Sequence, residues 1–164
     1  MTTTVINARD LDFEQLARAL RFEAGTAEGL SDAVEILVSD EAFVSGLMLA
    51  FITVEDTGAS QSAWVDWEAA AWAISTGEVE LSAEVEAAWL MAAHLAADIA
   101  IDLDDTLRAM DLHACSIAQQ ALGERTDADA TESSSFSLWE TAFAFGLAGR
   151  DRFADAWQLA GVFA

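Results

Sequence analysis

The chain has 164 residues, of which 54% are hydrophobic; this length and composition fit one folded domain with a buried core and exclude general disorder. Twenty-nine acidic residues face seven basic ones, all of them arginine, so the formal net charge is -22. A charge of this size bears on partners and solubility rather than on fold, and it argues against direct binding to nucleic acid.

Cysteine content and hydropathy bound the location of the chain. Cys115 is the single cysteine and cannot form an intramolecular disulfide, which favours a cytoplasmic protein. The N-terminal segment lacks the basic flank and apolar run of a signal peptide. The longest apolar stretches, 42–54 and 87–101, fall short of the roughly 18 residues that cross a bilayer. We therefore expect a soluble, cytoplasmic protein with no membrane partner.

Apolar residues at helical spacing predict three helices in the first third of the chain. The first begins near Asp10 or Asp12 and ends at Gly25. Ser31 can cap a short second helix, and Ser39 can cap a third. The third carries the apolar residues between Phe43 and Ile52 on nearly all its sides, which places it at the centre of the fold.

A polar segment with glycine, 56–60, predicts a loop before a tryptophan-rich helix. Trp64, Trp67 and Trp72 have the spacing of core anchors in that helix, whereas an exposed tryptophan among acidic neighbours would mark a protein interface. Strand signals are scarce, and only Thr2–Ile6 has a suitable β-branched run.

The second half of the chain also predicts helices. The stretch 82–122 is either one long helix or a hairpin that reverses near Asp104. The polar segment 123–135 predicts a mobile loop. Ser137 begins a helix with a capping box, and a last helix follows Gly149. The fold class that we expect is all-α, a single domain built as a bundle or irregular array of six to eight helices.

The distribution of charge is the most informative feature of the sequence. Between Phe22 and Leu107 the chain has no lysine or arginine, yet it has eighteen carboxylates there. Ion pairs on a helix need a base three or four residues from an acid, so we expect these acids to have no local ion pairs. Solubility alone asks for a net charge of only about 2 to 8 in a small domain. A basic partner, or a cytoplasm with very high salt, would explain the excess.

Carboxylates three or four residues apart on a helix have Cβ atoms about 5 to 6 Å apart, a spacing comparable to that of successive phosphates in DNA. The sequence contains a stripe at i, i+4 and i+7, a neighbouring pair, and an acidic patch before them. The stripe is Asp98, Asp102 and Asp105, the pair is Asp104 and Asp111, and the patch is Glu78, Glu80, Glu84 and Glu86. We interpret these residues as a partner-binding surface.

This surface predicts a non-enzymatic protein that imitates nucleic acid and occupies the basic nucleic-acid-binding surface of another protein. In size and charge the chain resembles the small acidic phage proteins that inhibit restriction or CRISPR enzymes, although it contains no motif of such a family. The resemblance implies an anti-defence inhibitor. The sequence leaves open whether the chain forms a homodimer.

Two other interpretations remain. In the first, the acidic, lysine-free surface is an adaptation to a halophilic cytoplasm, and the chain is a helical interaction or scaffold protein. In the second, His94, Asp98 and His113 meet across a helical hairpin and hold a metal ion. Packing of both histidines at a helix interface is the stronger reading, and we predict neither a metal site nor a cofactor. No phosphate loop and no nucleophile with its base accompany them.

Overall fold

The computed structural model describes residues 4–27 and 29–129, and these form a mixed α/β fold rather than the all-α fold predicted from the sequence. Three strands form one antiparallel sheet in the order β1-β2-β3. The strands are β1 (Thr4–Asn7), β2 (Ile52–Asp56) and β3 (Gln61–Val65). The α-helices are α1 (Phe13–Ala24), α2 (Leu30–Leu37), α3 (Trp67–Ser75), α4 (Ala83–Ala97), α5 (Leu103–Ala109) and α6 (Leu112–Asp129). Short 3-10 helices occupy Ala8–Asp10 (η1) and Gly46–Phe51 (η2).

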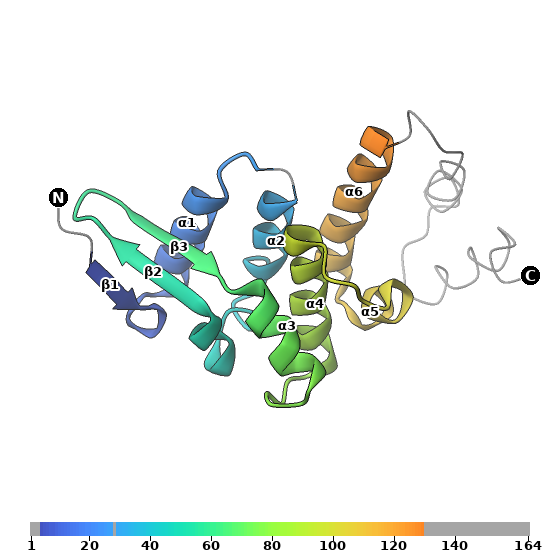
Figure 1. The fold of residues 1–164 in the computed structure, drawn as a ribbon, viewed down its shortest axis with the longest axis horizontal. Coiled ribbons are helices and arrows are strands. Elements are labelled where there is room, and N and C mark those ends of the chain that lie inside the picture. Colours follow the sequence, from blue (N-terminus) through green and yellow to red (C-terminus); the bar gives the residue numbers. More distant parts are fainter. Residues whose placement is uncertain (1–3, 28, 130–164) are drawn as a thin grey trace, which may run out of the picture. The chain divides into compact units, whose positions relative to one another are not determined.

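The chain divides into two compact units, residues 1–118 and 119–164. All the strands and the helices from α1 to α5 belong to the first unit, in which the sheet lies beside α1 and the other helices follow it (Figure 1). Whether the whole chain is the single domain predicted from the sequence stays a prediction.

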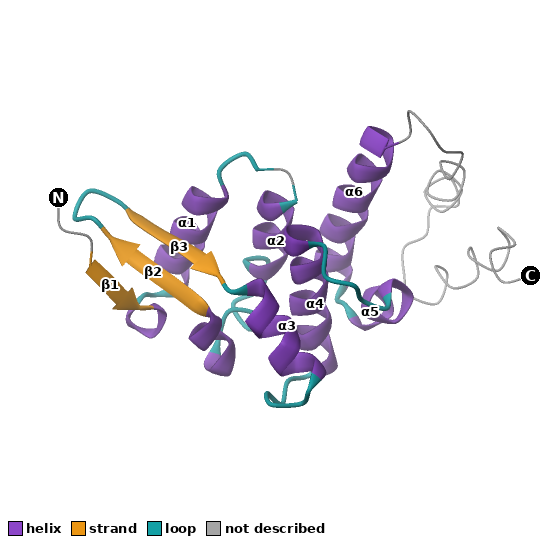
Figure 2. Cartoon of the chain, viewed as in Figure 1, coloured by secondary structure: helices purple, strands orange, loops and turns teal. Residues whose placement is uncertain are grey.

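The sheet overturns the central helix predicted to begin at Ser39. In its place the chain forms turns and then η2, and strand β2 begins at Ile52 (Figure 2). Ile52 and Val54 are buried while Thr53 between them is half-buried, which is the period of two that a strand requires. The β-branched run at 52–54 favours this outcome.

The predicted loop at 56–60 is present, but it joins two strands instead of two helices. Gly58 has a φ of 76° in this turn, and its N–H donates to Asp56 Oδ1 at 2.6 Å. A left-handed glycine beside an aspartate is typical of tight hairpin connections. Trp64 therefore lies in β3 and not in the tryptophan-rich helix, which begins at Trp67.

One face of the sheet is buried and the other is open. Ile6, Val54 and Ala63 lie opposite one another in the three strands, and Val54 and Ala63 are buried where α1 lies against β3. On the opposite face Val5 and Trp64 are exposed. Residues 4–6 of the predicted β-branched run thus belong to a strand, β1.

Helix α4 lies at the centre of the helical part. The sequence instead predicts this central position for the segment after Ser39. Helices α2, α3 and α5 all pack against α4. Trp89 of α4 is fully buried, and its indole Nε1 donates to the Phe43 carbonyl oxygen at 2.6 Å. The ring of Trp67 packs against Trp89 with centroids 6.2 Å apart.

Several helix ends are the ones that the sequence predicts. Asp12 caps α1 in a capping box with Gln15, and Gly25 ends that helix with a φ of 55°. Ser82 caps α4 through Val85 N–H. Helix α2 differs, because Gly29 and not Ser31 is its N-cap.

The stretch 82–122 is neither one helix nor a simple hairpin, because it contains α4, α5 and the larger part of α6. Asp98 ends α4 in the left-handed conformation, with a φ of 53°, and Asp102 caps α5. Helix α6 continues through 123–129, where the sequence predicts a mobile loop. Those residues include good helix formers and no proline, so one glycine does not end the helix.

The remaining loop residues 130–135 and the two helices predicted near Ser137 and after Gly149 lie outside the described residues. Among the helices that the structure describes, none is both long enough and apolar enough to cross a membrane.

Candidate functional site

The predicted stripe of Asp98, Asp102 and Asp105 does not lie on one helix, because the chain breaks between α4 and α5. Asp98 is the C-cap of α4, Asp102 is the N-cap of α5, and Asp105 lies in the first turn of α5. The spacing of i, i+4 and i+7 therefore does not produce the expected ladder of carboxylates. The helix end at Ala97, which no glycine or proline marks in the sequence, is the reason.

The fold instead brings two of these aspartates to a glutamate of the predicted patch. Glu86, Asp102 and Asp105 line one groove of about 400 Å³ between α4 and the segment 100–109. Leu90 and Ile101 supply apolar surface in the same groove. We call this feature the acidic groove. Its three carboxylates come from residues up to 19 positions apart, so helical spacing alone could not have found it.

Arg108 directly follows the segment, between Phe22 and Leu107, that has no lysine or arginine. Its positive charge partly compensates that of two neighbouring acids. Arg108 forms ion pairs with Asp104 at 2.6 Å and with Asp105 at 3.5 Å. The expectation that these acids have no local ion pair is therefore wrong, because Arg108 follows them at i+4 and i+3, the spacing that favours such pairs. Glu35 is also paired, with Arg21 across α1 and α2 at 2.7 Å.

Two other acids of the predicted surface accept hydrogen bonds from backbone N–H groups. Asp102 Oδ1 accepts a hydrogen bond from Asp105 N–H at 3.1 Å. Asp111 Oδ1 accepts from the N–H groups of His113 at 2.6 Å and Ala114 at 3.0 Å. Carboxylates at helix starts satisfy free backbone donors and interact favourably with the helix dipole. Asp102 and Asp111 thus have a structural role, whatever they bind.

The four glutamates of the predicted patch, unlike the aspartates above, are held by no arginine and no backbone group among the described residues. Glu78 and Glu80 lie before α4, and Glu84 and Glu86 lie in its first turn. All four are exposed, and within the described residues their carboxylates make no hydrogen bond and no ion pair. They are the predicted site residues whose charge the described structure leaves available to a partner.

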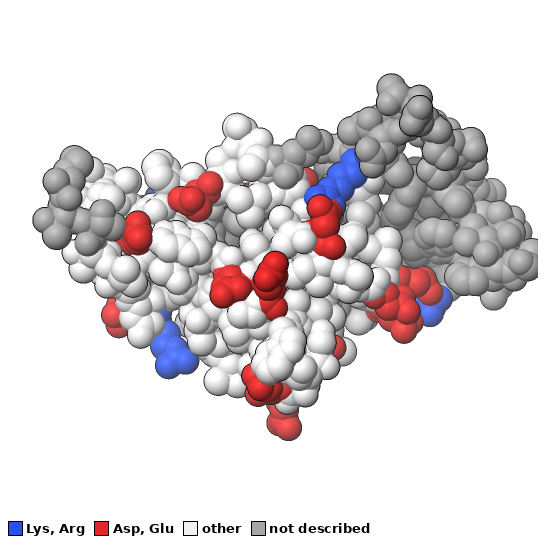
Figure 3. All heavy atoms as spheres, viewed as in Figure 1, with Lys and Arg blue, Asp and Glu red and all other residues white. Residues whose placement is uncertain are grey.

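The face in Figure 3 does not show the long continuous acidic surface that the sequence predicts. Its carboxylates lie in separate groups, among them one over the loop between α3 and α4 and one over α5 beside an arginine. On this face the acids therefore form separate groups.

The structure favours the alternative that the sequence left for the tryptophans, an exposed ring among acidic neighbours. Trp72, interpreted above as a core anchor, is 58% exposed, and Trp64 is also exposed. Trp72 is one turn before Ser75, which lines the acidic groove, and residues three apart on a helix are surface neighbours. Glu68 precedes Trp72 by four residues on the same face. An aromatic ring beside acidic groups is a typical interface anchor.

The metal site of the alternative interpretation, with His94, Asp98 and His113 as ligands, does not form in the described residues. His94 is half-buried, and its Nδ1 lies 2.9 Å from the Ile99 carbonyl oxygen. His113 is exposed at the start of α6. In the part of the chain that the structure describes, no three histidine, cysteine, aspartate or glutamate residues gather closely enough to hold a metal ion.

Comparison of the chain with protein-family models, with curated proteins and with solved structures finds no match.

Proposed function

We propose that the chain is a non-enzymatic binding protein of the cytoplasm that occupies a basic, nucleic-acid-binding surface of another protein. The acidic groove is the observation that carries the proposal. It places three carboxylates around an apolar surface of a size that admits side chains of a partner. A single cysteine agrees with a reducing compartment.

The groove suits arginine or lysine better than a simple cation. The methylene stem of either side chain can lie along Leu90 and Ile101 while the charged head lies between Glu86 and Asp102. Arginine also forms paired hydrogen bonds with a carboxylate, the same geometry by which it binds phosphate. A groove that binds such side chains therefore competes with nucleic acid for them.

The free glutamates and Trp72 supply the other parts of the mechanism. Glu78, Glu80 and Glu84 raise the negative potential near the groove, which speeds the approach of a basic partner. Exposed Trp72 offers a large apolar contact next to the groove, which adds affinity that does not depend on salt. Charge then determines the rate of association, and the tryptophan contact slows dissociation.

The test uses a variant with a neutral groove. Glu86→Gln, Asp102→Asn and Asp105→Asn remove three charges, and asparagine at 102 still caps α5. The matched control is Asp10→Asn, Glu23→Gln and Glu41→Gln, three exposed acids away from the groove. Each full-length chain is immobilised and exposed to a cell lysate, and bound proteins are then eluted with a DNA duplex.

We expect the wild type and the control to retain proteins that the duplex releases. The groove variant should retain at least about tenfold less of them, because each lost charged hydrogen bond weakens binding several-fold. Equal retention by the groove variant and the control would refute the assigned surface. Retained proteins that the duplex fails to release would refute the imitation of nucleic acid.

A further inference from the structure

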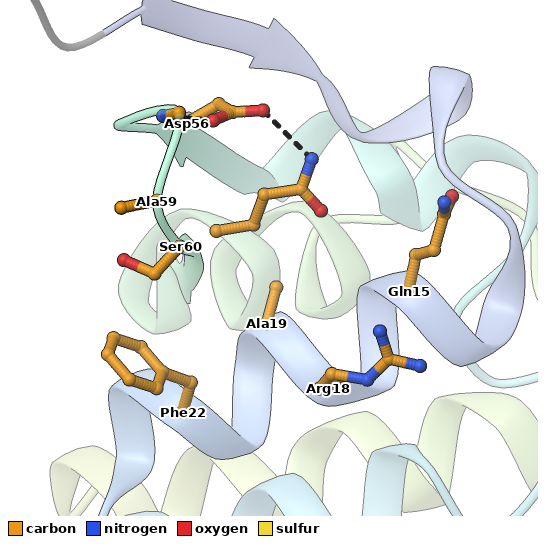
Figure 4. Close-up of a pocket in the computed structure, with 9 residues that line it drawn as sticks. Gln15, Arg18, Ala19, Phe22, Asp56, Ala59 and Ser60 are labelled. Atoms are coloured by element: carbon orange, nitrogen blue, oxygen red, sulfur yellow. Dashed lines mark hydrogen bonds between the residues drawn. The ribbon is translucent and has the colours of Figure 1, made fainter.

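A second cavity lies at the other side of the first unit, between α1 and the hairpin turn that joins β2 to β3. Its volume is about 440 Å³, within the range of cavities that hold small molecules. Figure 4 shows Gln15, Arg18 and Phe22 on α1 at one wall, with Asp56 and Ser60 of the turn across from them. This cavity shares no residue with the acidic groove.

The helix wall has an available cation beside an exposed aromatic ring. Within the described residues the guanidinium of Arg18 makes no ion pair or hydrogen bond, although the chain has 29 acids. Phe22 follows it by four residues and is 61% exposed. Both residues line the cavity, with Ala19 between them on the same wall of α1. This wall can bind a carboxylate and an apolar group at the same time.

The opposite wall has a carboxylate that is held in place. Asp56 Oδ1 accepts from Gly58 N–H at 2.6 Å, and Oδ2 accepts from Gln61 Nε2 at 3.0 Å. The hydrogen bond from Gln61 first, and then the one from Gly58, lowers the pKa of Asp56 below its usual value. Asp56 and Arg18 line the same cavity without forming an ion pair with each other.

We infer that this cavity binds a free amino acid with an apolar side chain. Its carboxylate lies against Arg18, its ammonium group against Asp56, and its side chain on the ring of Phe22. Arg18 and Asp56 carry charges of opposite sign in the lining of one cavity, on α1 and on the hairpin turn, and a zwitterion can satisfy both.

The charge of the whole chain selects a zwitterion over a simple anion. A net charge of -22 repels anionic ligands at long range, and Asp56 repels them within the cavity. A cationic ligand would leave Arg18 without a partner and beside a like charge. An amino acid has no net charge, so neither effect opposes its binding.

Calorimetric titration of the full chain with L-phenylalanine tests the inference. We expect saturable binding with one site, and Arg18→Gln and Asp56→Asn should each weaken it about tenfold, the usual effect of losing a charged hydrogen bond. Arg9→Gln is the matched control, since Arg9 is exposed and lies outside the cavity. Asparagine at 56 retains an oxygen that can accept from Gly58, so the hairpin turn is preserved.

Two derivatives separate the contributions of the ligand ends. The methyl ester of L-phenylalanine lacks the carboxylate, and N-acetyl-L-phenylalanine lacks the ammonium group; both should bind at least about tenfold more weakly than the amino acid. No detectable binding of L-phenylalanine would overturn the inference. Equal binding of either derivative, or equal loss in Arg9→Gln and Arg18→Gln, would overturn it as well. None of these outcomes depends on the acidic groove.

Discussion

Individual aspartates explain part of the charge without any partner. Asp12, Asp66 and Asp102 cap helices with their side chains, and Asp56 closes the hairpin turn. Asparagine or serine could make the same hydrogen bonds, yet the chain contains a single asparagine. Each such aspartate therefore adds a negative charge as a by-product of capping. The excess that needs a partner is smaller than the net charge suggests.

The ion pair between Arg21 and Glu35 should make the stability of the fold depend on pH. Hydrogen bonds from Arg21 hold the pKa of Glu35 below its ordinary value of 4.5, with the positive charge of Arg21 adding to them and burial opposing them. A lowered pKa stabilises the fold above the unfolded-state value, and that stabilisation disappears as the pH falls through the lower, folded-state value.

Glu35→Gln should thus lower the free energy of unfolding by about 0.5 to 1 kcal/mol near neutral pH, since both side chains are about half exposed. The difference from wild type should shrink as the pH falls below 4.5. Urea unfolding at several pH values measures it, with Glu23→Gln as the control at an exposed acid. A difference that stays constant into strongly acidic solution would contradict the assignment.

Single residues also show what helical spacing could and could not reveal about the site. The pairs of Arg108 with Asp104 and Asp105 follow from spacing alone and were available in the sequence. The sequence could not show that Glu86 and Asp105 line the same groove, because this depends on the direction in which α5 leaves α4. Exposure of Trp72 likewise depends on which face of α3 packs against α4.

Among the elements, strand β2 gives the sharpest test of the revised fold. Thr53→Ala replaces a β-branched residue with the best helix former, so it would stabilise the helix predicted from the sequence. In a strand the same change should lower the free energy of unfolding by about 0.5 kcal/mol. Thr53 lies opposite Asn7 and Trp64, and it is half-buried.

Urea unfolding of Thr53→Ala distinguishes the two structures by the sign of the change. Glu14→Ala, at an exposed position of α1, is the control and should stay within about 0.5 kcal/mol of wild type. An increase in stability for Thr53→Ala would favour a helix at this position and reject the strand.

The elements that the sequence predicts well are those with local end signals. Helices α1 and α4 have side-chain caps at their starts, and such caps act within three or four residues. The pairing of β1 with β2 joins segments more than 40 residues apart, as in Ile6 with Val54. Because most of 42–52 is apolar, its pattern could not distinguish a buried helix from turns followed by a strand.

For the whole molecule, salt dependence separates the binding proposal from adaptation to a saline cytoplasm. If the acidic groove and its glutamates serve a partner, the chain should unfold cooperatively at about 0.1 M KCl, and added salt should raise its stability only modestly by screening repulsion. Circular dichroism during urea unfolding at increasing KCl measures this. Helical content that appears only in molar KCl would instead support the halophilic interpretation.

Asp98 takes a backbone conformation that few residues other than glycine adopt, and the path of the chain depends on it. By ending α4 there, it lets the next segment return along that helix, so that Asp102 and Asp105 come to the side of Glu86. Adding or removing one residue between 98 and 102 would rotate α5 and separate the carboxylates while leaving the composition and the charge of the chain intact. Relatives of this protein that keep the acids but change the length of that connection should therefore lack the groove.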